Sequence, residues 1–180
     1  MSLDKEKYWK KVSILENFFR SQLKYHRDKI YEIILNKIIF NGKNILDIGS
    51  TPDLDDHHNT LLHKIKNNDE ITCFSNYDCS ILKKLNPNFK IIKGNGLKTN
   101  LKDDSFDIVH SSATIEHVGN DYNQNLFIRE CLRISKKKVI ITTPNRYFPI
   151  DFHTKIPFIH FFPKKIHRKL LALTNNQFFS

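Results

Sequence analysis

Short apolar runs recur along most of this chain and are separated by more polar stretches. The runs fall near residues 44–48, 70–74, 89–93, 106–110 and 138–142. Segments with helical spacing of their apolar residues lie between some of these runs, near 54–66, 78–85 and 122–134. Because strands that alternate with helices are typical of a parallel sheet covered on both faces, the pattern predicts an α/β fold.

The pattern before the first run has helical spacing. Residues 5–26 carry apolar side chains three and four positions apart, which predicts an amphipathic helix. A second helix is predicted at about 28–40, where Ile30, Ile33 and Ile34 share one face. The helical preamble is predicted to belong to the same domain as the strands that follow.

The 180 residues suit a single domain with three parts. These parts are a helical segment at 1–43, a core at 44–145 and a basic, aromatic tail at 146–180. The net charge is +10, and residues 136–180 carry nine Lys and Arg against one acid. Such an excess suits an anionic partner, although a genome that favours lysine codons would produce it too. The aromatic side chains of the tail suit either a partner or the cover of a sheet.

Composition favours an ordinary globular protein of the cytoplasm. Hydrophobic residues make up 39% and charged residues 27% of the chain, and the N-terminal residues do not resemble a signal peptide. Cys73, Cys79 and Cys131 form no CxxC pair, which favours reduced thiols. Residues 55–58, Asp-Asp-His-His, resemble a metal cluster. Acids are expected at a helix start, however, and neighbouring histidines point apart, so no metal site is predicted.

The segment ILDIGSTPD, residues 45–53, carries the strongest local signal. An apolar run ends at Asp47, Gly49 follows, and Thr51-Pro52 can open a helix. Such a strand–turn–helix corner builds a small-molecule site at the end of a parallel strand. A carboxylate there suits a ligand with an ammonium or sulfonium group. The same pattern also fits a buried Asp47 that caps the next helix.

Three blocks of the chain resemble class I S-adenosylmethionine-dependent methyltransferases, and within them a small-molecule subgroup of type 11. The blocks are ILDIGS at 45–50, GNGLKTNLKDDSFDIVHSSATIEHVG at 94–119 and KKVIITTPN at 137–145. The resemblance covers about residues 44–145. It implies a Rossmann-like three-layer sandwich, a mostly parallel sheet and one cofactor site across the strand ends. The last β-hairpin of that fold has no counterpart in the pattern and is expected to be missing.

The resemblance also implies which residues bind S-adenosylmethionine. In the family the Asp of the first motif serves the aminoacyl end of the cofactor, and Asp47 matches it. Gly49 would let the backbone approach the cofactor. The other predicted cofactor-binding residues are Ser50, Ser75, Asn76, Asn95, Gly96, Leu97 and Ser111.

The second strand departs from the family. Relatives usually end this strand with an acid that binds both ribose hydroxyls, whereas Ser75 or Asn76 stands there in this chain. A neutral acceptor makes a weaker hydrogen bond than a carboxylate does. Asn95 likewise replaces an acid that contacts the adenine amino group in many relatives, and its carbonyl can accept the same bond.

Two histidines are the candidates for a general base. His117 occupies the segment that usually flanks the transferable methyl, and His153 follows the fifth strand. A hydroxyl acceptor must lose its proton, and histidine titrates near neutral pH. His117 would equally suit a packing role, and many methyltransferases need no base because proximity to the sulfonium suffices.

The sequence therefore predicts methyl transfer to an oxygen or nitrogen of a small-molecule or saccharide-like acceptor. The acceptor is expected to be anionic, with a membrane-surface or lipid-linked substrate and a homodimer as further options. One alternative is a non-enzymatic relative that has lost the cofactor, since the second-strand acid is missing. Another is an RNA methyltransferase that uses the basic tail, although the chain lacks the NPPY-type motif of the common nucleic-acid class.

Overall fold

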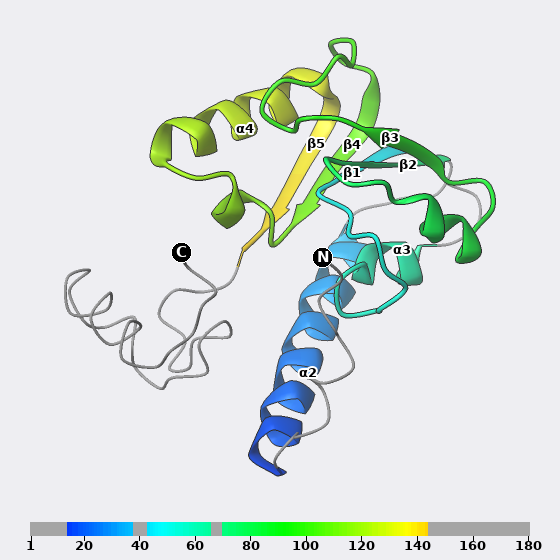
Figure 1. Cartoon of the computed structure of the whole chain (residues 1–180), viewed down its shortest axis with the longest axis vertical. Coiled ribbons are helices and arrows are strands. Elements are labelled where there is room, and N and C mark those ends of the chain that lie inside the picture. Colours follow the sequence, from blue (N-terminus) through cyan, green and yellow to red (C-terminus); the bar gives the residue numbers. More distant parts are fainter. Residues whose placement is uncertain (1–13, 38–42, 66–69, 144–180) are drawn as a thin grey trace, which may run out of the picture.

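The computed structural model describes residues 14–37, 43–65 and 70–143, which form a five-stranded parallel sheet with flanking helices (Figure 1). The strands are β1 (Asn44–Ile48), β2 (Glu70–Ser75), β3 (Lys90–Lys93), β4 (Phe106–Ser112) and β5 (Ser135–Thr142). Their order is β3-β2-β1-β4-β5, and every neighbouring pair is parallel. The predicted α/β class and all five predicted runs are confirmed, with β2, β4 and β5 longer than the runs that predicted them and β3 one residue shorter.

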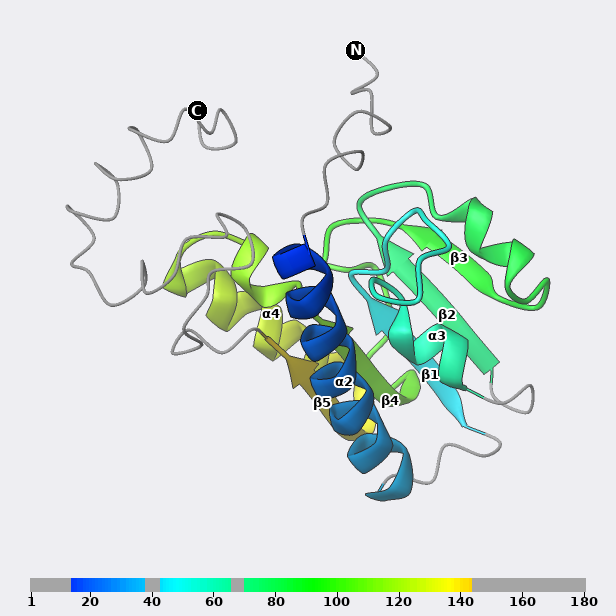
Figure 2. The same ribbon diagram turned by 90° about the horizontal axis from the view of Figure 1, so that it is seen from below.

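Helices cover both faces of this sheet and make the fold three-layered. The helices are α2 (Ile14–Lys37), α3 (Thr60–Lys64) and α4 (Asp121–Ile134), with 3₁₀ turns η1 (Ser80–Lys84) and η2 (Ile115–His117). Figures 1 and 2 show α2 and α3 on one face and α4 on the other. Strand alternation explains the two cores: Ile45 packs with Tyr31 on the α2 face, and Leu46 packs with Phe127 on the α4 face.

One continuous helix stands where the pattern predicted two. The expected break between 5–26 and 28–40 is wrong, because α2 runs from Ile14 to Lys37 without interruption. The sequence of α2 contains neither glycine nor proline, so nothing in the backbone ends the helix at residue 27.

The buried face of α2 also differs from the prediction. Ile30 and Ile33 are 47% and 54% exposed, whereas Tyr31 is 2% exposed and packs in the core with Ile34 and Leu35. The buried face of α2 is therefore rotated from the face with Ile30 and Ile33 that the sequence pattern indicated. The same side of α2 carries Lys24 and Arg27, which bind the loop after β1.

The helix predicted at 54–66 is much shorter, and Thr51-Pro52 does not open it. Asp53 accepts a hydrogen bond from the Asp55 N–H at 3.0 Å, and Asp55 accepts one from the His57 N–H at 2.8 Å. These local bonds satisfy the backbone in turns and compete with the helix, which begins only at Thr60. The helix predicted at 78–85 is the 3₁₀ turn η1.

A polar network fastens α4 to the loop that follows β3. Glu130 accepts bonds from the Thr99 N–H at 2.7 Å and from the Thr99 hydroxyl at 2.6 Å. Arg133 donates to Glu130 and also pairs with Asp103. The guanidinium of Arg133, followed by the Thr99 donors, lowers the pKa of Glu130 to about 2. The network holds the end of the loop whose first residues line the cleft described below.

Some predictions fall on residues outside the described ranges. These are the first part of the helix at 5–26, the tail at 146–180 with its proposed cover of the sheet, and the missing final hairpin. Among the helices that are described, none combines the length and the apolar character needed to cross a bilayer.

The Glu130 network predicts a pH-dependent loss of stability in Glu130→Gln. Because its folded-state pKa is lowered, the carboxylate stabilises the fold above its ordinary pKa of 4.5 and loses that effect as the pH falls towards about 2. We expect the variant to lose about 1–2 kcal/mol of unfolding free energy at pH 7, and less at pH 3, by urea titration.

Glu70→Gln is the matched control for this measurement. Glu70 also forms an ion pair, with Lys90 at 3.0 Å, but the two side chains are 69% and 63% exposed. We expect a change of at most about 0.5 kcal/mol, since solvent screens such a pair. Equal losses in the two variants would contradict the role assigned to Glu130.

Candidate functional site

A cleft of about 920 Å³ opens at the carboxyl ends of the central strands. Its walls come from the segments that follow β1, β2, β3 and β4, together with single residues of α2 and α4. The cleft lies where the strand order reverses, because β1 pairs with β2 on one side and with β4 on the other. Parallel α/β sheets bind ligands at this point, and the volume suits an organic molecule of cofactor size.

Gly49 forms the sharp corner between β1 and the loop that lines this cleft. Its φ is +99°, a left-handed conformation that side chains disfavour. A Cβ at this position would lie 2.0 Å from Thr114 Oγ1, so the loop after β4 passes directly against the bare backbone. The Gly49 N–H donates to the Phe74 carbonyl at 2.8 Å. The predicted need for glycine here agrees with this geometry.

Asp47 does not face the cleft, contrary to the expectation that its carboxylate would meet the ligand. The side chain is buried, with Oδ1 at 2.6 Å from His110 Nδ1 and Oδ2 accepting from the Ser50 hydroxyl at 2.6 Å. The space beside it measures about 10 Å³, which holds one water at most. The strand pleat is the cause, because Asp47 shares its face with Ile45 and points towards α2.

The predicted residues that follow β1 and β2 do reach the cleft. Ser50 lines it while its hydroxyl binds Asp47. Ser75 is buried and its hydroxyl oxygen accepts a bond from the Tyr77 N–H at 3.3 Å. Asn76 is exposed on the cleft wall. Asn76 is thus better placed than Ser75 to bind a ligand hydroxyl.

The predicted residues that follow β3 form a turn on the opposite wall. Asn95, Gly96 and Leu97 all line the cleft, and Asn95 Oδ1 accepts a bond from the Leu97 N–H at 2.9 Å. A Cβ on Gly96 would come within 3.2 Å of the Phe127 ring, so the turn packs closely on α4. The local bond occupies one lone pair of the Asn95 carbonyl and leaves the amide group for other partners.

The predicted residues after β4 divide into two groups. Ser111 is buried on the α4 face of the strand and does not line the cleft, whereas Ser112 does. The alternation of side chains along β4 explains the difference. His117 is exposed on the cleft wall at the end of η2, as a base for a bound acceptor would be. His153 lies outside the described residues.

The charged groups on the cleft wall are all basic. Arg27 and Lys93 line it with three histidines, His57, His58 and His117. No Asp or Glu belongs to the lining that the described residues form. The wall therefore lacks the carboxylate expected for a ribose or an ammonium group, and its charge favours an anionic ligand.

Several cleft residues carried no signal strong enough to be chosen from the sequence. Tyr77 is 62% exposed on the wall, and its ring can stack on a planar base. Thr51 Oγ1 is a buried cleft-side oxygen that has no hydrogen-bond partner within the described part of the chain. His110, which directly follows the apolar pair Ile108-Val109 in β4, was a visible signal for the partner of Asp47.

The run at 55–58 keeps its acids and histidines close together, with ligand atoms of Asp55, Asp56 and His57 within 4.8 Å of one another. The acids have other partners, however. Asp55 accepts from the His57 N–H, and Asp56 pairs with Lys24 at 3.0 Å. The hydrogen bond and ion pair to Lys24 lower the pKa of Asp56. The arrangement serves to shape the loop.

Comparison with known proteins finds a methyltransferase-domain match over part of the chain and a shared fold. Residues 71–142 match the family model described as a methyltransferase domain. A SAM-dependent methyltransferase of Aquifex aeolicus has a TM-score of 0.53 at 13% identity, over 81% of this chain and 78% of that chain. A protein of Pyrococcus horikoshii has a TM-score of 0.52 at 21% identity, over 64% of this chain and 57% of that chain. At these identities the likeness establishes the fold.

Other relatives are longer than the part that matches. A SAM-dependent methyltransferase of Methanosarcina mazei has a TM-score of 0.45 at 20% identity, over 58% of this chain and 52% of that chain. The chain thus spans about half the length of such relatives. No curated protein matches it significantly.

The Gly49 corner predicts that Gly49→Ala is strongly destabilising. The new Cβ meets both the left-handed φ and the Thr114 hydroxyl, and we expect a loss of about 1–3 kcal/mol or more in unfolding free energy. Gly119→Ala is the control, since φ is +105° there but the nearest atom to a Cβ is Asn123 Nδ2 at 3.2 Å.

Chemical denaturation of both variants checks this expectation. Gly49→Ala should lose more stability than Gly119→Ala, and adding Thr114→Ala should restore part of the difference because it removes the clashing hydroxyl. Equal losses in the two glycine variants would show that backbone strain alone matters at the corner.

Proposed function

We propose that this chain, whose residues 71–142 match a methyltransferase domain, transfers the methyl group of S-adenosylmethionine to an oxygen or nitrogen of a small-molecule or saccharide-like acceptor. One observation carries the proposal: a cleft of cofactor size opens around Gly49, at the switch point of the sheet, in the position that the fold uses for this ligand. The sulfonium of the bound cofactor supplies an electrophilic methyl group.

The residues on the wall fit the cofactor through neutral groups. Gly49 and Thr51 line the cleft at the corner after β1, where a polar end of the ligand would lie. Asn76 can accept a ribose hydroxyl, and Asn95 can bind the adenine amino group. Tyr77 can stack on the purine. These contacts are fewer and weaker than a carboxylate would make, so we expect modest affinity.

His117 is the proposed base for a hydroxyl acceptor. It lies on the cleft wall in η2, in the segment after β4 that the family uses beside the reactive methyl. There the imidazole would take the proton that the acceptor oxygen loses as the new bond to carbon forms. For an acceptor that needs no base, the same side chain would shape the pocket, and proximity would account for the rate.

The basic wall supports an anionic acceptor. Arg27 and Lys93 approach the cleft from α2 and from the end of β3, and the described lining contains no acid to oppose them. A carboxylate or phosphate on the acceptor would be attracted to this wall. We place the reaction in the cytoplasm, because Cys73, Cys79 and Cys131 are free thiols and buried in the core.

A second candidate is a non-enzymatic protein that keeps the fold without the cofactor. The observation that favours it is the withdrawal of Asp47 from the cleft together with the neutral end of β2. The third reading from the sequence, an RNA methyltransferase, depends on the tail, which lies outside the described residues. Titration with S-adenosylhomocysteine separates the first two, since only the enzyme should bind it.

Calorimetry with S-adenosylhomocysteine is therefore the first test, and Asn76→Asp sharpens it. We expect the wild type to bind, and the variant to bind about fivefold more tightly because a carboxylate accepts a ribose hydroxyl more strongly. Asn88→Asp adds the same charge on an exposed residue outside the cleft and should leave the affinity unchanged. No heat and no thermal shift in the wild type would refute the enzymatic proposal.

The anionic acceptor predicts unequal effects of removing two lysines from one strand. Lys93 lines the cleft, whereas Lys90 pairs with Glu70 outside it. In an assay that follows release of S-adenosylhomocysteine, we expect Lys93→Gln to raise the KM for uronic acids several-fold relative to the KM for neutral sugars. Lys90→Gln should leave this ratio of KM values unchanged. Equal KM changes for charged and neutral acceptors would contradict an anionic substrate.

A further inference from the structure

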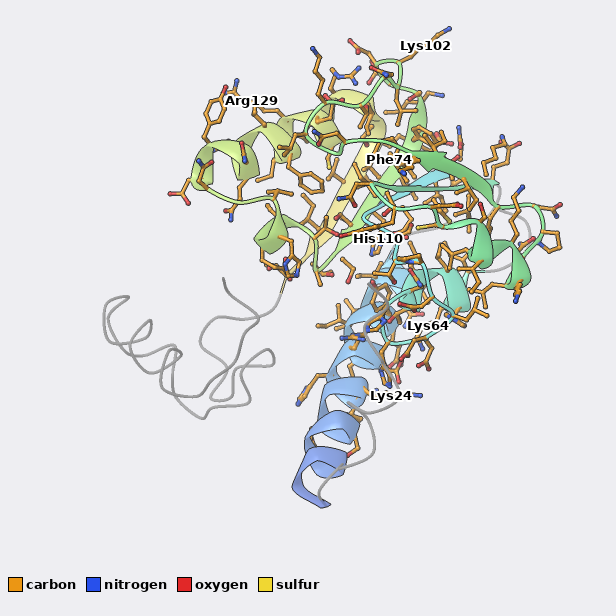
Figure 3. All side chains as sticks on the ribbon, viewed as in Figure 1. Lys24, Lys64, Phe74, Lys102, His110 and Arg129 are labelled. Atoms are coloured by element: carbon orange, nitrogen blue, oxygen red, sulfur yellow. The ribbon has the colours of Figure 1, made fainter. Side chains whose placement is uncertain are left out.

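Three buried hydrogen bonds link α2 to the corner of the proposed cofactor site. Tyr31 Oη lies 3.0 Å from His110 Nε2, and His110 Nδ1 lies 2.6 Å from Asp47 Oδ1. The second carboxylate oxygen, Asp47 Oδ2, accepts from the Ser50 hydroxyl at 2.6 Å. This series of hydrogen bonds runs from α2 through β4 and β1 to the loop that lines the cleft. Figure 3 shows the labelled His110 where the sheet meets α2.

Burial gives these bonds a defined direction. None of the four side chains belongs to a residue more than 6% exposed. Burial raises the pKa of Tyr31 to about 12, so the phenol keeps its proton at neutral pH. The phenol O–H can donate to His110 Nε2, and the Nδ1–H of that His110 tautomer can then donate to the Asp47 carboxylate. This arrangement gives each of the three side chains a hydrogen-bond partner.

The sheet register brings the central pair together. Asp47 and His110 are directly paired residues of β1 and β4, on the face that carries Ile45 and Ile108. Both side chains must then point towards α2, where Tyr31 completes the chain. The Tyr31 and His110 rings lie 5.7 Å apart between centroids, so they also pack against each other.

The same stripe of α2 holds the loop that follows the corner. Lys24 pairs with Asp56 at 3.0 Å, Arg27 donates to the His57 carbonyl, and Lys64 of α3 pairs with Asp28 at 2.8 Å. Arg27 and Asp28 follow Lys24 by three and four positions, and Tyr31 follows them by four and three, so these residues lie on one side of α2. Helix α2 is thus linked to the Gly49 corner through Tyr31, and it contacts the loop after β1 through Lys24 and Arg27.

We propose that Tyr31 and His110 are positioning residues for cofactor binding, acting through Asp47 on the Gly49–Ser50 turn. They touch no ligand themselves. They hold the carboxylate so that Ser50 is drawn inwards and the Gly49 backbone faces the cleft, which makes the turn complementary to the aminoacyl end of the cofactor. This inference rests on the proposed function, because it assigns affinity for that cofactor to a helix outside the binding wall.

Binding of S-adenosylhomocysteine to Tyr31→Phe, His110→Asn and the double variant tests the proposal. We expect each single variant to bind about tenfold more weakly by calorimetry. The double variant should bind no more weakly than the worse single variant, because the bonds act in series. Independent losses that multiply, or affinities within twofold of the wild type, would overturn the proposal.

Ile71→Val controls for general loosening of the core. Ile71 is 2% exposed in the same cluster but makes no contact with the hydrogen-bonded chain that the structure records. It should lower the melting temperature about as much as Tyr31→Phe while leaving the affinity unchanged. If Ile71→Val weakened binding equally, Tyr31 would be a packing residue only. If the wild type itself failed to bind S-adenosylhomocysteine, that result would refute the proposed function, on which this inference rests.

A spectroscopic measurement tests the hydrogen bonds of His110 directly, first in the wild type and then in Tyr31→Phe. Nitrogen-15 NMR of the histidine rings should show His110 as the neutral tautomer protonated at Nδ1. In Tyr31→Phe the Nε2 resonance should shift, since it loses its donor. A proton on Nε2 at neutral pH, or an unchanged Nε2 resonance in the variant, would overturn the proposed direction of these hydrogen bonds.

Discussion

The bond between Asp47 and His110 is the contact on which the arrangement of the site depends. It joins the first and fourth strands where the sheet order reverses, and the low exposure of both groups makes the loss of either partner costly. Helix α2 covers the bond with Tyr31 and extends its contacts to the loop after β1. The corner at Gly49 is thereby attached to the helix layer as well as to the sheet.

This attachment changes the electrostatics of the cleft. A carboxylate withdrawn into the protein leaves the wall to Asn76, Asn95 and hydroxyl groups, with Arg27 and Lys93 as the fully charged members. A cofactor with a sulfonium would be bound mainly by shape, backbone groups and stacking. The basic wall at the same time favours an acceptor of opposite charge. Under the proposed function, modest cofactor affinity and selection for an anionic acceptor would have one structural cause.

Much of the fold followed from local patterns. Recurring apolar runs predicted five strands, and the strand–turn–helix corner at 45–53 predicted the edge of the sheet where the cleft lies. The continuous helix α2 did not follow from the sequence. The absence of glycine and proline allows its two halves to form one helix, but no residue pattern indicates that they do. The loop at 51–59 did not follow either, since Asp53 and Asp55 can cap a helix or form turns, and the competition is settled by neighbouring segments.

By itself the sequence determined the class of fold and the glycine corner, because each depends on residue types at short spacing. The sequence was also compatible with two interpretations of Asp47, as a ligand for the cofactor and as a buried carboxylate. Tertiary structure alone decided between them. The direction of a strand-end side chain depends on pleat parity, on the residue paired across the sheet and on the helix above it. His110 and Tyr31 lie 63 and 79 positions apart from their partners in this chain of bonds, a separation that no local pattern encodes.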